Sequence, residues 1–113
     1  MKLTDIVSRI VIDPRKLTDY ALNLKSPLGC HKAIMFEKIL GFTSSNYTDL
    51  LIQIEKHATI EPIVLHSKDE FGYRYNMDIK VNGIEGRQAV IRIGWFIPYG
   101  VDEARLATLF VRR

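Results

Sequence analysis

The feature that most constrains the fold is a pair of segments, residues 73–81 and 87–95, joined by a turn that contains two glycines. In the first segment the odd-numbered residues are apolar or aromatic and the even-numbered residues are polar. A period of two is typical of a strand that is buried on one face. We therefore predict a β-hairpin with one face against a core and one polar face.

The register of this hairpin follows from the requirement that its two apolar faces coincide. A register that satisfies it places Tyr75 opposite Trp95 and Asp78 opposite Arg92. A register slipped by two residues satisfies it as well and instead places Asn76 opposite Arg92. In both cases Gly94 leaves an opening beside Arg92. Both registers put the same side chains on the polar face, namely Arg74, Asn76, Asp78, Lys80 and Arg92.

The segments before the hairpin have the patterns of helices. A proline opens a predicted short helix over residues 14–23. A serine-proline pair and Gly41 bound a predicted helix over residues 28–40. Apolar residues at helical spacing predict a third helix over residues 46–57, with a serine or asparagine as its N-cap. Residues 1–13 suit either a helix or an edge strand and are treated as an N-terminal extension of the domain.

Two further segments have the composition of strands. Residues 60–66 predict a short edge strand, because Pro62 cannot donate a hydrogen bond to a central ladder. Residues 106–111 predict a last strand. Helices followed by strands in succession are typical of an α+β fold. We predict a single domain over residues 1–113, in which the N-terminal helices pack on one face of a four-stranded antiparallel meander sheet.

Composition restricts the class of protein. With 113 residues and 47% apolar residues, the chain can bury a core without disulfides, and the single cysteine, Cys30, cannot form an intramolecular one. No apolar run approaches the roughly 18 residues of a membrane span, so we expect a cytoplasmic location. The three histidines lack the spacing of metal ligands, so we expect no metal and no cofactor. A net charge of +3 suits RNA or an acidic protein as the partner.

Several short runs carry a resemblance to a known family. They are residues 16–23, 31–33, 40–42, 50–51, 72–75, 86–87 and 105–108, together with Phe36, His57, Arg92 and Trp95. On these runs the chain resembles a small uncharacterised bacterial domain family, over nearly its whole length after Asp13. The layout is similar to that of metal-independent ribonuclease toxins of the barnase, EndoU, colicin and RelE type. The resemblance implies RNA as the substrate and a cognate antitoxin or immunity protein as the partner.

The chemistry of such an enzyme defines the groups to look for. The 2′-hydroxyl needs a base or an orienting group, the phosphoryl oxygens need cations, and the leaving oxygen needs an acid. The residues that can supply these groups are His31, Lys32, His57, Arg74, Tyr75, Asp78, Arg92 and Thr108.

The roles of these candidates follow from their chemistry. Arg74 and Arg92 can clamp a phosphate, and Lys32 can add a point charge. His31, His57 or Tyr75 can transfer protons. Thr108 can orient the substrate through its hydroxyl, and Asp78 can hold Arg92 in place.

Each candidate also has a structural interpretation. Asp78 and Arg92 form an ordinary cross-strand ion pair, and His57 lies near a helix C-terminus, where the helix dipole favours a cation. Tyr75 lies on the apolar face of its strand, and Thr108 is a good strand former. Two functions stay open on the sequence: a metal-independent ribonuclease toxin, or a non-enzymatic RNA- or protein-binding module that uses the same polar face.

Overall fold

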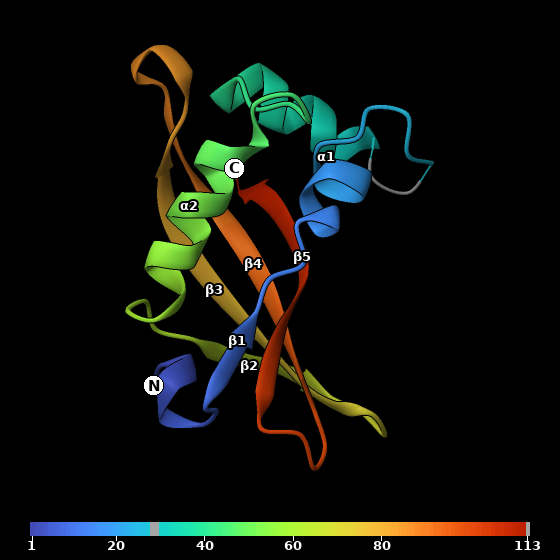
Figure 1. The fold of residues 1–113 in the computed structure, drawn as a ribbon, viewed down its shortest axis with the longest axis vertical. Coiled ribbons are helices and arrows are strands. Elements are labelled where there is room, and N and C mark those ends of the chain that lie inside the picture. Colours follow the sequence, from blue (N-terminus) through green and yellow to red (C-terminus); the bar gives the residue numbers. More distant parts are fainter. Residues whose placement is uncertain (28–29, 113) are drawn as a thin grey trace.

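The computed structural model describes residues 1–27 and 30–112 and shows an α+β fold, in which helices cover one face of a five-stranded mixed sheet (Figure 1). The symbol η marks the short 3-10 and π helices. In chain order the elements are η1 (Leu3–Asp5), β1 (Arg9–Val11), η2 (Lys16–Ala21), α1 (Cys30–Met35), η3 (Phe36–Leu40), α2 (Tyr47–Ala58), β2 (Val64–Lys68), β3 (Gly72–Asn82), η4 (Ile84–Gly86), β4 (Gln88–Pro98) and β5 (Glu103–Arg112).

The sheet has the strand order β1-β5-β4-β3-β2. Strands β2 to β5 pair antiparallel in succession, and β1 adds to β5 in parallel, with Arg9 opposite Glu103. The predicted sheet of four strands was therefore wrong, because the N-terminal segment supplies a fifth. Two parallel strands are not joined by a short hairpin turn, so the sequence next to β1 contains no turn signal that would predict this pairing. Leu3 and Val7 from the same segment are buried in the core.

The β3–β4 hairpin has the predicted register. Tyr75 lies opposite Trp95 and Asp78 opposite Arg92, so the first of the two registers is confirmed. The apolar face is buried in one core that also contains Leu50 and Ile54 of α2. The fully buried hairpin side chains on this face are Met77, Ile79, Val81, Ile91, Ile93 and Trp95. Tyr75, next to edge strand β2, is only partly buried.

The helices agree with the sequence patterns in position but not in every detail. Gly41 ends η3 in the left-handed region with φ of 77°, as predicted for a helix C-terminus. Helix α2 begins within a residue of its predicted start, but the predicted side-chain cap is absent. The Asn46 carboxamide turns back instead, where it accepts from the Thr43 amide and donates to the Gly41 carbonyl. It therefore fastens the turn that precedes the helix.

Two irregularities in the sheet determine which side chains reach its polar face. In β2 the pairing jumps from Leu65 to Ser67, which leaves His66 as a bulged residue. In β5 the pairing jumps between Leu106 and Thr108, so Ala107 is the extra residue. Bulges redirect side chains and often border functional sites.

Candidate functional site

The centre of the polar face is a cluster of one carboxylate and two arginines. Asp78 accepts from Arg92 Nε at 2.8 Å and from Arg92 Nη2 at 3.0 Å, and it also accepts from Arg112 Nη1 at 2.5 Å. These bonds, chiefly those from Arg92, hold the pKa of Asp78 below its ordinary value. Asp78 therefore stays ionised near neutral pH, where it positions Arg92 and has no proton to give.

A cavity of about 310 Å³ lies beside this cluster on the polar face. It is lined by His66, Arg74, Tyr75, Asn76, Arg92, Gly94, Trp95, Ala107, Thr108 and Phe110. The structure thus brings together Arg74, Arg92 and Thr108 from the predicted set. Among the described residues no carboxylate lines this cavity, although Asp78 and Asp69 pair with Arg92 and Arg74 beside it, so the groups that face the cavity are guanidinium donors. An anion is the ligand that such walls favour.

Tyr75 is placed differently from the role predicted for it. Side chains alternate between the faces of a strand, so the Tyr75 ring points to the face opposite Arg74 and Asn76. The ring lies 6.4 Å from that of Tyr73, which occupies the same side. The alternation therefore directs the Tyr75 phenol to the face of β3 opposite Arg74.

Arg74 is held in place from two sides. Its guanidinium carbon lies 4.6 Å from the centroid of the Phe96 ring, and its Nε lies 3.5 Å from Asp69 Oδ2. The Asp69 carboxylate in turn accepts from the Phe71 and Gly72 amides, and these bonds lower its pKa. Stacking on an aromatic ring leaves the edge of a guanidinium free to bind an oxyanion.

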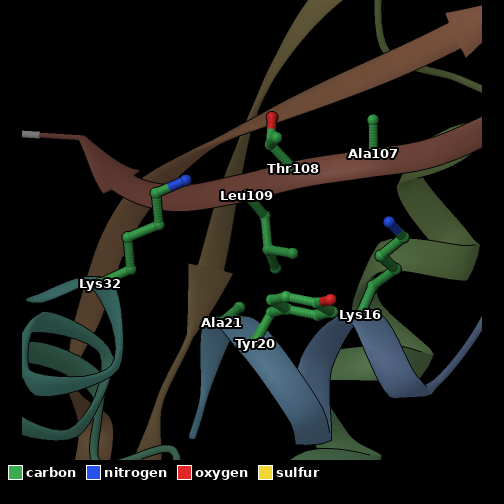
Figure 2. Close-up of a pocket in the computed structure, with 7 residues that line it drawn as sticks. All are labelled: Lys16, Tyr20, Ala21, Lys32, Ala107, Thr108 and Leu109. Carbon is green, nitrogen blue, oxygen red and sulfur yellow. The ribbon is translucent and has the colours of Figure 1, made fainter. Parts of the chain in front are cut away.

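Thr108 sits at the junction between this cavity and a second one. Its hydroxyl lies over Gly94 so closely that a Cβ at Gly94 would overlap with Oγ1. Ala107 and Thr108 also line a neighbouring cavity of about 290 Å³, whose other walls are Lys16, Tyr20, Ala21, Lys32 and Leu109. Figure 2 shows Tyr20 between the two lysines, with both ammonium groups turned towards β5.

Lys32 links the helical layer to the sheet. It comes from α1, and its Nζ lies 5.8 Å from the centroid of the Phe110 ring, which lines the first cavity. Lys32 and Phe110 also border a third hollow of about 410 Å³, and His31 lines that one. The structure therefore places Lys32 beside Thr108, whereas His31 lies next to the site and outside the Arg92 cavity.

His57 is not brought to the site. Its Nδ1 lies 3.7 Å from Glu61 Oε2 near the end of α2, and its side chain is about one-quarter exposed. The histidine that lines the Arg92 cavity is His66, which the sequence interpretation had considered only as a metal ligand. Its bulged position cannot be read from the alternation of apolar residues. Lys16 and Tyr20 were also missed, because their helical turn had no predicted face.

The lining of the two cavities offers several groups that can bind an oxyanion. Two arginines, a hydroxyl and an imidazole line one cavity, and a lysine borders the next. Among the described residues, no group of three His, Cys, Asp or Glu side chains is placed to hold a metal ion. No helix in the described ranges is long and apolar enough to span a bilayer.

Comparison with known proteins gives one family. Residues 2–113 match a family model described as "Domain of unknown function (DUF6883)". No curated protein and no solved structure matches the chain. The expected relationship to a small uncharacterised domain family is thereby confirmed, and these comparisons show no similarity to a ribonuclease.

Proposed function

The chain belongs to the DUF6883 family, whose description assigns no activity, and we propose from the chemistry of the site that it is a metal-independent ribonuclease. The observation that carries this proposal is the Arg92 cavity. It combines Arg92, Arg74, Thr108 and His66 within one hollow of about 310 Å³ with no lining carboxylate. A phosphodiester has the charge and the acceptor oxygens that these groups recognise.

The two arginines supply charge for the transition state. Arg92 donates through Nε and Nη2 to Asp78, which fixes the plane of the guanidinium. No hydrogen bond from Nη1 is found among residues 1–27 and 30–112, and we assign this nitrogen to the phosphoryl oxygens of the substrate. Arg74 and the Thr108 hydroxyl add donors from the neighbouring strands. Donors that are fixed before the reaction stabilise the charge that develops on the phosphoryl oxygens.

Two further groups suit the proton transfers. His66 lies on the β2 side of the Arg92 cavity, and Lys32 lies on the α1 side of Thr108. His66 takes the proton of the 2′-hydroxyl while the 2′-oxygen forms a bond to phosphorus. The bond from phosphorus to the 5′-oxygen breaks, and Lys32 protonates that oxygen. The products are a 2′,3′-cyclic phosphate and a 5′-hydroxyl, and no metal enters the balance.

We propose further that this ribonuclease acts as a toxin in the cell that makes it. Cleavage of cellular RNA arrests growth, so we propose a cognate antitoxin or immunity protein as the partner. An acidic protein that covers the Arg92 cavity would neutralise the enzyme and would match the net charge of +3.

The test uses the purified protein and a fluorescent unstructured RNA in the presence of EDTA. We expect cleavage to a 2′,3′-cyclic phosphate, which mass spectrometry identifies, and no cleavage of a 2′-O-methyl copy. Arg92→Ala should slow cleavage by roughly a hundredfold, the usual effect of removing one preorganised donor. Lys56→Ala, which removes an exposed lysine on α2, is the control for net charge and should cleave normally.

The same experiment separates the alternative function. A non-enzymatic RNA-binding module would bind the 2′-O-methyl copy with a strong dependence on salt but would leave RNA intact. A protein-binding module would show neither RNA binding at low salt nor growth arrest when expression is induced in bacteria. Either result refutes the ribonuclease.

A further inference from the structure

The cavity between Lys16, Tyr20 and Lys32 has the features of a nucleotide subsite. Tyr20 is 51% exposed, so its ring is a large aromatic surface open to solvent. Lys16 Nζ lies 5.6 Å from the centroid of this ring. Figure 2 shows Lys32 on the opposite side of Tyr20, beneath β5. The cavity thus consists of one aromatic ring with a cation on each side of it.

This cavity adjoins the Arg92 cavity across β5. Ala107 and Thr108 line both, and among the described residues neither has a carboxylate in its lining. On its far side, Lys16 and Tyr20 border a separate hollow lined also by Asp13, Arg15 and Asp19, where Arg15 pairs with Asp13 at 2.7 Å. The cations that can bind a phosphate backbone therefore extend from Arg92, across β5 at Thr108, to Lys32 and Lys16.

A nucleotide within an RNA strand matches the order of these groups, in which an aromatic ring lies between cations. Its base offers a π-face for stacking, and a phosphate stands on either side of its sugar. If the scissile phosphate occupies the Arg92 cavity, then Lys32 lies next to the leaving 5′-oxygen, which belongs to the nucleotide on the 3′ side. The next phosphate along the strand then reaches Lys16.

We infer that the Lys16–Tyr20–Lys32 cavity binds the nucleotide on the 3′ side of the cleaved bond, with its base stacked on Tyr20 and its 3′-phosphate on Lys16. This inference rests on the proposed ribonuclease activity. It restricts the substrate to single-stranded RNA, because a base within a duplex is already stacked and paired and cannot lie on Tyr20.

The experiment uses DNA oligonucleotides that contain a single ribonucleotide, so that only one bond can be cleaved. The nucleotide 3′ to that bond either carries a base or is abasic. Wild-type protein should cleave the substrate with the base more efficiently, on the order of tenfold or more. Stacking of one base on an aromatic side chain stabilises binding by about the free energy that corresponds to this ratio. Tyr20→Ala should remove this preference, whereas Tyr20→Phe, which keeps the ring, should retain it.

A second substrate pair tests Lys16. One oligonucleotide ends with a 3′-phosphate after the nucleotide in the subsite, and the other ends with a 3′-hydroxyl there. Lys16→Ala should lower the cleavage efficiency of the phosphorylated substrate and leave that of the other unchanged. Lys56→Ala should affect neither, and circular dichroism verifies that each variant is folded.

The outcomes separate the subsite from the activity. Equal cleavage of the base-containing and abasic substrates by the wild type overturns the subsite and leaves the ribonuclease standing. A preference for the base that persists in Tyr20→Ala overturns the role of Tyr20. Cleavage of a duplex as fast as of a single strand overturns the restriction to single-stranded RNA. No cleavage of any substrate overturns both proposals.

Discussion

Replacing Gly94 by alanine should destabilise the folded protein when Thr108 is present and stabilise it when Thr108 is replaced by alanine. The backbone of Gly94 is not in the left-handed region, so alanine is tolerated there by the main chain. A Cβ at this position would nevertheless overlap with Thr108 Oγ1, while Thr108 Cβ lies at an ordinary 3.7 Å. Overpacking of this kind costs about 1–3 kcal/mol. Alanine recovers roughly 0.5–1 kcal/mol by restricting the unfolded chain.

The expected net effect of Gly94→Ala is a loss of about 0–2.5 kcal/mol in the free energy of unfolding. In a Thr108→Ala background the overlap is absent, so the same substitution should stabilise the protein by about 0.5–1 kcal/mol. Urea unfolding of the four proteins, followed by far-ultraviolet circular dichroism, measures both differences. An equal effect of Gly94→Ala in both backgrounds would refute the packing of Thr108 over Gly94.

Three further predictions concern the hairpin and its two faces. Met77→Asp places a charge in the core and should lower the free energy of unfolding by several kcal/mol. Lys80→Asp on the exposed face should lower it by less than about 1 kcal/mol. Near-normal stability of Met77→Asp in thermal unfolding would refute the face assignment. The pKa of Asp78 is lowered in the folded state, so its stabilising contribution is present above the unfolded pKa of about 3.9 and is lost as the pH falls through the lower folded value. The stability gap between wild type and Asp78→Asn should therefore narrow below about pH 4, and a gap that stays constant in acid would contradict the ion pair. The exchange Asp78→Arg with Arg92→Asp keeps the cross-strand pair but loses the bond from Arg112, so it should retain the fold at reduced stability and lose RNA cleavage. Cleavage that survives the exchange would leave Arg92 with a structural role alone.

The sequence was most informative where its signals are local. The alternation in the hairpin predicted which residues face the core, and the need to match two apolar faces narrowed the register to two choices. One of these two registers pairs Asp78 with Arg92, and that pairing is present. Helix α2 was predicted nearly to the residue because its apolar side chains have a clear period.

The parts that were missed depend on contacts that are distant in the chain or on irregular backbone. Strand β1 pairs with β5 over only three residues, so no pattern of its own distinguishes it from a loop. A single extra residue in a strand changes which side chain reaches the cavity, and the bulge at His66 did so without any proline or glycine to indicate it. Lys16 and Tyr20 join the site only because η2 packs beside β5.

The position of β5 within the sheet has a consequence for synthesis on the ribosome. It is the last strand along the chain, yet it lies between β4 and the first strand, and Ser8 near that strand bonds to Asp102 across a separation of 94 residues. A nascent chain that has exposed only residues up to β4 lacks the strand that carries Ala107 and Thr108. The fold can therefore be completed only after β5 leaves the exit tunnel, and until then the nascent chain holds neither the complete sheet nor the two cavities that β5 lines.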